Sequence, residues 1–169
     1  YDRHGRLLRE VVNEQGARAK WIDRVADNVK AATLAAEDRD FYEHSGVDGR
    51  AVLRAAWQNL REQRVVSGAS TITMQMVRMH GGYPQRSLLG KLRQAFEAWR
   101  VERALTKEEI LVQYVNRASY GAGTIGVEAA SRRYFGKPHD HLSVAEAALL
   151  AALPPAPPTH PPQRHPGQA

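Results

Sequence analysis

Acidic, aromatic and histidine side chains gather in one short stretch, LAAEDRDFYEHSG, at residues 34–46. If the helix of the preceding apolar VKAATLAA continues through it, Glu37, Phe41 and His44 share one face, at spacing i, i+4 and i+7. Asp38 then projects about a quarter-turn away. Glu37 extends the apolar face, where a carboxylate is suited to proton transfer. A solvated helix end, with its charges facing water, explains the pattern equally well.

A second group of polar side chains follows in SGASTITMQMVR, residues 67–78. Ser70 can cap a helix here, and Thr71, Gln75 and Arg78 then lie on one face. The free N–H groups of a helix N-terminus, together with hydroxyls and an arginine, suit a phosphate or pyrophosphate. An ordinary capped amphipathic helix accounts for the same residues, and from this stretch alone we favour it.

Basic residues dominate the segment between Pro84 and Lys107. Such an excess could neutralise the phosphates of a leaving group or of a nucleic-acid backbone. It could equally form a solvated helix face, which we favour for two of its arginines, Arg100 and Arg103. The basic residues are Arg86, Lys91, Arg93, Arg100, Arg103 and Lys107, against the acidic Glu97 and Glu102.

The stretch ILVQYVNRASYGAG places Tyr114 and Asn116 at the end of a predicted helix that runs into a glycine-rich turn. Asparagine is common as a helix cap or turn residue, because its short amide side chain bonds to nearby backbone groups. We therefore interpret Asn116 as structural and not as a catalyst.

The elements that must position these residues are predicted to be helices. A cap at Asp27 or Asn28 opens a helix that runs to His44, and further helices are expected at Val47–Arg64, behind Gly68, and at Leu88–Leu105. Two capping boxes and one glycine stop mark three more, and the opening residues 1–12 have the pattern of an extended segment or hairpin. These three marks are Thr106-x-x-Glu109, Ser143-x-x-Glu146 and Gly136 after GVEAASRRYF.

Length and composition agree with a compact, mainly α domain. The 169 residues suit one domain, and 43% hydrophobic with 25% charged residues argue against wholesale disorder. Residues 154–169 contain seven of the nine prolines and are interpreted as a linker or tail. The net charge of +6 indicates an anionic partner, which could be nucleic acid, a phospholipid surface or a phosphorylated substrate. The absence of cysteine excludes disulfides and thiolate metal sites.

The order of these stretches resembles the motif set of a known family. The segments EDRDFYEHSGVD, GASTITMQMVR, GKLRQ, ILVQYVNRASYG, and GVEAASRRYFGK with LSVAEAALLAALPPAP, are similar to the five motifs of the peptidoglycan glycosyltransferase domain, glycosyltransferase family 51. This domain occurs in bifunctional class A penicillin-binding proteins and in monofunctional glycosyltransferases. The resemblance implies a lysozyme-like, mostly helical fold over residues 1–153, with residues 154–169 leading toward a transpeptidase domain.

The resemblance also implies an activity and a place. Such domains polymerise lipid II into glycan strands at the outer, periplasmic face of the bacterial inner membrane, to which the full chains are anchored. The donor is the growing chain on undecaprenyl pyrophosphate, and the acceptor is a new lipid II. Glu37 matches the glutamate of the first motif, which implies a general base on the acceptor 4-hydroxyl, in an inverting attack on the donor sugar.

The remaining motif positions carry further expectations. Asp38, Phe41, His44 and Gly46 complete the first motif, where the aspartate is associated with supporting the site or with a divalent ion. No cofactor is required by the resemblance, and a divalent metal ion is left open, with Asp38 as a weak candidate ligand. The second-motif positions imply contacts with the donor pyrophosphate and sugars, and they are Ser70, Thr71, Gln75 and Arg78. The third-motif position, Lys91, implies stabilisation of the departing pyrophosphate. The fourth-motif positions, Tyr114 and Asn116, imply a mainly structural role.

The third motif departs from the family pattern R-K-x-x-E. Gly90 stands in place of the arginine and Gln94 in place of the second glutamate. An amide hydrogen-bonds but neither takes a proton nor binds a cation as a carboxylate does. Arg93 is the expected replacement for the lost positive charge, whereas Glu97 is a weaker candidate for the lost carboxylate.

Two other readings remain to be compared with the glycosyltransferase. A lysozyme-like glycan-cleaving enzyme would also use one glutamate but needs no basic cluster for pyrophosphate. A basic, helical nucleic-acid binder would leave the acidic motif unexplained and would favour a helix-turn-helix pattern, which the sequence lacks. The glycosyltransferase hypothesis predicts that the domain binds no nucleic acid and contacts a membrane surface through Val47–Leu60. It also predicts that moenomycin competes for Arg78 and Lys91.

Overall fold

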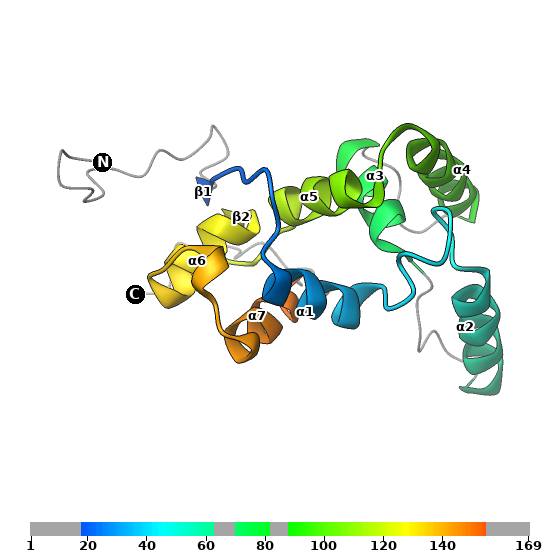
Figure 1. Ribbon diagram of the computed structural model, residues 1–169. Helices are drawn as coiled ribbons and strands as arrows, with labels where there is room; N and C mark the ends of the chain where they lie inside the picture. The colour runs from blue at the N-terminus through cyan, green and yellow to red at the C-terminus, as the bar shows by residue number, and fades with distance from the viewer. Residues whose placement is uncertain (1–17, 63–69, 82–87, 155–169) are drawn as a thin grey trace, which may run out of the picture.

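The computed structural model describes residues 18–62, 70–81 and 88–154, and within them the chain is mainly α-helical, as the sequence predicts (Figure 1). Seven α-helices lie in these segments, with two very short strands and one 3₁₀ turn. The helices are α1 (Asp27–Glu37), α2 (Gly49–Glu62), α3 (Ile72–Gly81), α4 (Leu88–Ala104), α5 (Lys107–Arg117), α6 (Val127–Phe135) and α7 (Val144–Ala151). The strands are β1 (Arg18–Ala19) and β2 (Thr124–Ile125), and the 3₁₀ turn η1 is His139–His141.

The strands pair in parallel, with Arg18 opposite Thr124 and Ala19 opposite Ile125. This pairing joins the start of the described chain to the turn that precedes α6. The extended segment or hairpin predicted for residues 1–12 lies outside the described residues, as do residues 155–169 of the predicted tail.

The core forms around α5, which packs against α3, while α3 also packs against α4 and α1 packs against α7. Ile110, Leu111, Tyr114 and Val115 of α5 are completely buried. Their spacing of i, i+1, i+4 and i+5 gives α5 a wide apolar face, so that neighbouring helices cover it. The central position of α5 brings Tyr114 close to the residues of the first two motifs.

Local signals predicted the starts and ends of several helices correctly. Thr106 and Ser143 each accept a hydrogen bond from the backbone N–H three residues on, and both capping boxes are complete. Gly136 ends α6 in the left-handed conformation, with φ of 71°. The predicted cap of α1 is wrong, because Ala26 occupies the cap position and Asp27 is already the first helical residue. The side chain of Asn28 instead donates to the carbonyl of Leu142, 3.0 Å away.

The predicted extension of α1 to His44 is also wrong. The helix ends at Glu37, and Asp38 has φ of −161° and ψ of 79°, far from helical values. Residues 39–43 then form turns in which the N–H of Phe41 donates to the carbonyl of Asp38. Phe41 and His44 therefore do not share a helical face with Glu37. Phe41 turns into the core, where it is completely buried.

Among the described residues, none of the helices combines the length and hydropathy that crossing a bilayer requires.

Candidate active site

Glu37, the last residue of α1, is held by a residue of the second motif. The side-chain Nε2 of Gln75 donates to Oε2 of Glu37 at 2.7 Å. The other oxygen, Oε1, is buried and has no hydrogen-bond partner in the described part of the chain. The carboxylate thus connects α1 to α3, with one oxygen bound and one facing inward, and the residue as a whole is partly exposed.

The negative charge of Glu37 acts on two tyrosine hydroxyls, and the positive charge of Arg78 acts on one of them. Burial and then the negative charge of Glu37 raise the pKa of Tyr114 well above its usual value, and the positive charge of Arg78 opposes this rise. Burial and Glu37 also raise the pKa of Tyr120. Arg78 lies one turn after Gln75 on α3 and is partly exposed. The site therefore combines one carboxylate, one arginine and two tyrosines that stay protonated.

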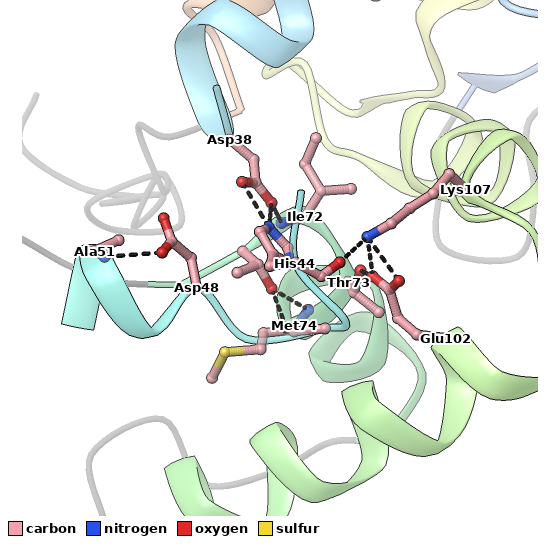
Figure 2. Close-up of polar contacts among 11 residues, drawn as sticks. Asp38, His44, Asp48, Ala51, Ile72, Thr73, Met74, Glu102 and Lys107 are labelled. Carbon is pink, nitrogen blue, oxygen red and sulfur yellow. Dashed lines mark hydrogen bonds and ion pairs between the residues drawn. The ribbon is translucent and has the colours of Figure 1, made fainter. Parts of the chain in front are cut away.

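Asp38 organises the turn after α1, where its carboxylate lies against His44 and Ile72 (Figure 2). Its Oδ2 accepts from the N–H of Ile72, at the start of α3, at 3.0 Å. Nε2 of His44 lies 3.0 Å from Oδ1 and 3.1 Å from Oδ2. Both oxygens are therefore engaged within the protein. The described residues also contain no group of three or more His, Cys, Asp or Glu side chains that would hold a metal ion. The carboxylate of Asp38 thus connects the end of α1 to the first-motif turn and to the start of α3.

Thr71 caps α3, whereas the sequence predicted Ser70 as the cap. The hydroxyl of Thr71 accepts from the N–H of Met74 at 3.1 Å and donates to the carbonyl of Gly46 at 2.6 Å. Gly46 has φ of 91°, and a Cβ there would lie 2.8 Å from the backbone of Ala98 on α4. The first-motif turn is thus fixed to α3 and α4 by close backbone contact. Because its hydroxyl is used in this way, Thr71 contributes here to structure, while Ser70 precedes α3 and is partly exposed.

A buried ion pair that sequence reasoning missed joins the same elements. Nζ of Lys107 lies 2.6 Å from Oε2 of Glu102 and donates to the carbonyl of His44 at 2.6 Å (Figure 2). It also lies 4.4 Å from the ring centroid of Phe41. Thr73 donates to Glu102 from α3. The sequence had assigned Lys107 and Glu102 only to a charged segment, yet the side chain of Glu102 is 5% exposed.

The third-motif residues lie on α4. Lys91 and Arg93 are exposed, and neither forms an ion pair with another residue that the structure describes. Gln94 is buried, at the position of the missing glutamate. Glu97 pairs with Arg100 on the same helix, at 3.2 Å. Glu97 is therefore engaged with α4 itself, whereas the two basic side chains remain accessible to an anion.

Asn116 connects α5 to the segment before α1. Its side chain accepts from the N–H of Ile22 at 2.9 Å and donates to the carbonyls of Ile22 and Val112, each at 2.8 Å. The residue is buried, and all three bonds are to backbone groups. This geometry agrees with the structural role expected from the sequence.

Replacing Asn116 with alanine should destabilise the protein by about 2 kcal/mol. The substitution leaves the backbone N–H and carbonyl of Ile22 without their partner, and unpaired buried polar groups are costly. Chemical denaturation of the variant and the wild type measures the difference. A loss below about 0.5 kcal/mol would contradict the structural assignment, because that is the range of ordinary surface substitutions.

A comparison with known families agrees with this arrangement. The sequence model of one family, described as Transglycosylase, matches residues 4–169. This chain belongs to the transglycosylase family. The match covers all five motifs, including the turn after α1 and the capped start of α3. It also agrees with the mainly α, lysozyme-like fold.

Curated relatives of this transglycosylase domain are penicillin-binding proteins. Penicillin-binding protein 1A of Aquifex aeolicus is 41% identical over 172 residues, which cover 100% of this chain and 23% of the relative. Penicillin-binding protein 1C of Escherichia coli is 45% identical over 148 residues, covering 88% of this chain and 19% of the relative. The chain therefore spans about a fifth of the length of these proteins. The forms GASTITMQ, with Met74 where the family usually has glutamine, and GKLRQ favour similarity to penicillin-binding protein 1C, in agreement with that identity.

Proposed function

We propose that this domain is a peptidoglycan glycosyltransferase that polymerises lipid II, with Glu37 as the general base. The observation that carries the proposal is the Glu37 carboxylate, fixed by Gln75 at the end of α1 in a chain of the transglycosylase family. Gln75 orients one carboxylate oxygen without protonating it, because an amide N–H does not transfer its proton at neutral pH. Glu37 therefore remains able to accept a proton from the substrate.

The reaction joins two lipid-linked sugars. The 4-hydroxyl oxygen of the acceptor GlcNAc forms a bond to C1 of the donor MurNAc, and the hydroxyl proton passes to the carboxylate of Glu37. The bond between C1 and the pyrophosphate oxygen breaks, and its electron pair leaves with undecaprenyl pyrophosphate. Attack from the face opposite the leaving group inverts the configuration at C1.

The departing pyrophosphate requires positive charge. Arg78 lies one helical turn from Gln75, and its guanidinium can donate two parallel hydrogen bonds to phosphate oxygens. Lys91 and Arg93, exposed on α4, are the further cations that we assign to the donor. Ser70, just before α3, is assigned to the same contact from its motif position. Moenomycin, which resembles the lipid-linked donor, should compete for Arg78 and Lys91.

Assay of the purified protein with labelled lipid II tests the proposal. Electrophoresis should reveal glycan polymer that a lysozyme digests. A glycan-cleaving enzyme would instead shorten preformed peptidoglycan, and a nucleic-acid binder would do neither. Absence of polymer under conditions in which a related class A penicillin-binding protein is active would contradict the proposal.

Two amphipathic helices give the domain a surface suited to a membrane. On α2, large apolar side chains are exposed beside Arg50, Arg54 and Arg61, and α4 carries an apolar stripe at spacing of three and four residues beside its basic residues. In Figure 1, α2 and α4 lie at one end of the molecule, away from α6 and α7. Apolar and basic side chains on one helix favour the interface of an anionic bilayer. The exposed apolar residues are Val52, Leu53, Trp57 and Leu60 on α2, and Leu89, Leu92, Phe96 and Trp99 on α4.

We assign this surface to the periplasmic face of the inner membrane, where lipid II would be presented. The sequence predicted Val47–Leu60 as the contact, and the exposed stripe of α4 extends it. A transmembrane anchor and a transpeptidase domain, as in class A penicillin-binding proteins, belong to the same proposal for the full-length protein.

Leu53→Asp and Phe96→Asp should each lower binding to vesicles of anionic phospholipid by about tenfold, because each removes one large exposed apolar side chain that the bilayer would bury. Co-sedimentation measures the bound fraction. Leu149→Asp is the matched control, since Leu149 is 62% exposed but lies on α7. Equal loss in all three variants, or none in the first two, would place the membrane contact elsewhere.

A further inference from the structure

Two buried polar atoms without partners belong to the candidate base and to a tyrosine on which its charge acts. They are Oε1 of Glu37 and the hydroxyl of Tyr114, and neither has a hydrogen-bond partner in the described segments. Most buried polar atoms in proteins are hydrogen-bonded, so two orphans at one place require an explanation. The atoms come from different elements, the end of α1 and the middle of α5.

The two atoms are chemically complementary. An ionised carboxylate oxygen only accepts hydrogen bonds, and a phenolic hydroxyl donates one. The charge of Glu37 reaches Tyr114 strongly enough to raise the pKa of its hydroxyl, after burial as the first cause, so the tyrosine keeps its proton. The hydroxyl hydrogen can turn about the C–O bond toward the carboxylate oxygen that acts on it.

We propose that Tyr114 is a positioning residue for the reaction, whose hydroxyl donates a hydrogen bond to the inward oxygen Oε1 of Glu37. The inference rests on the proposed role of Glu37 as the base. With Gln75 on Oε2 and Tyr114 on Oε1, donors from α3 and α5 hold the two ends of the carboxylate and fix its plane. Tyr114 is completely buried, so it touches no substrate and acts only through Glu37.

This arrangement has a consequence for proton transfer. The acceptor hydroxyl must approach a lone pair of Oε2 that Gln75 leaves free, and the rate depends on a distance that carboxylate rotation would change. One hydrogen bond at Oε2 leaves the carboxylate free to pivot about that bond. A second bond at Oε1 prevents the pivot. Tyr114 therefore contributes to the catalytic step and not to the affinity for substrate.

Tyr120 offers an internal comparison. It is also buried, and burial and then Glu37 raise the pKa of its hydroxyl as well. The hydroxyl of Tyr120, however, is not among the buried atoms that lack a partner. The orphaned oxygen of Glu37 is therefore matched by the orphaned hydroxyl of Tyr114.

Separate measurement of kcat and KM for lipid II tests the proposal with Tyr114→Phe, which removes the hydroxyl and keeps the buried ring. We expect kcat to fall about tenfold, with KM changed less than about twofold and Tm nearly unchanged. Tyr120→Phe should lower kcat by a smaller factor. Tyr134→Phe is the control for a lost tyrosine hydroxyl, since that hydroxyl donates to the backbone of Tyr120 from α6. It should leave kcat within about twofold of wild type.

Two results would overturn the proposal. One is an unchanged kcat in Tyr114→Phe, and the other is a joint change of kcat, KM and Tm, which indicates a purely structural tyrosine. If the variant does not fold, 4-fluorophenylalanine at position 114 fills the space of the hydroxyl but donates no hydrogen bond, and an unchanged kcat there has the same meaning. Glu37→Gln, measured in parallel, separates the proposed role of Tyr114 from that of Glu37. If Glu37→Gln polymerises lipid II as wild type does, Glu37 is not the general base, and the proposed function itself is wrong.

Discussion

Replacing Glu37 with glutamine should lower kcat for lipid II polymerisation by about 10²- to 10⁴-fold, the usual contribution of a general base. The amide has nearly the shape of the carboxylate and still accepts the hydrogen bond from Gln75, 2.7 Å away in the wild type. It does not accept the proton of the acceptor hydroxyl. The fold should be retained, so the loss should appear in turnover and not in thermal stability. Single-turnover assays with labelled lipid II measure the effect.

Glu43→Gln provides the matched control. Glu43 belongs to the same acidic stretch, but its side chain is 68% exposed and lies 4.0 Å from Arg50. Neutralising it changes the net charge of the chain by the same amount as Glu37→Gln and should leave turnover near that of wild type. Similar losses in both variants would indicate that the stretch acts through its overall charge, and the assignment of Glu37 as the base would then be wrong.

The sequence predicted those parts of the fold that depend on neighbouring residues. The capping boxes at Thr106 and Ser143 and the left-handed Gly136 involve groups within four residues of each other, so the pattern contains the whole interaction. The end of α1 depends instead on a residue far away in the sequence. Periodicity extended that helix to His44, whereas the chain turns at Asp38 because its carboxylate binds the N–H of Ile72, 34 residues away.

The candidate site shows the same division. The motif order pointed to Glu37 and Gln75, and the structure brings the two side chains together. The relation between Glu37 and Tyr114 was not predicted, because it arises only when α5 packs against the first two motifs. The apolar stripe of α4 could have been found. Leu89, Leu92, Phe96 and Trp99 recur every three or four residues, but the basic residues between them were given more weight.

Lys107 and Glu102 illustrate an interaction that was beyond reach of the sequence pattern. The sequence placed both only in a charged segment between Pro84 and Lys107, yet the side chains are 21% and 5% exposed. Lys107 binds Glu102, the carbonyl of His44 and the ring of Phe41, so one ammonium group connects α5, α4 and the first-motif turn. Because that turn follows Glu37 directly, this contact also determines where the candidate base lies.

Replacing Lys107 with methionine should therefore destabilise the protein by about 3–5 kcal/mol, since it leaves the charge of Glu102 buried without its partner. For a chain of this size, such a loss lowers Tm by about 6–20 °C. Calorimetry measures the change in Tm.

Lys30→Met is the control, because the Lys30–Glu108 pair is similar in length, at 2.6 Å, but the glutamate is 59% exposed. That variant should lose less than about 1 kcal/mol. The double variant Lys107→Met with Glu102→Leu should recover much of the stability, because no buried charge is then left unpaired. Equal effects of Lys107→Met and Lys30→Met would mean that the buried pair contributes no more than a surface contact.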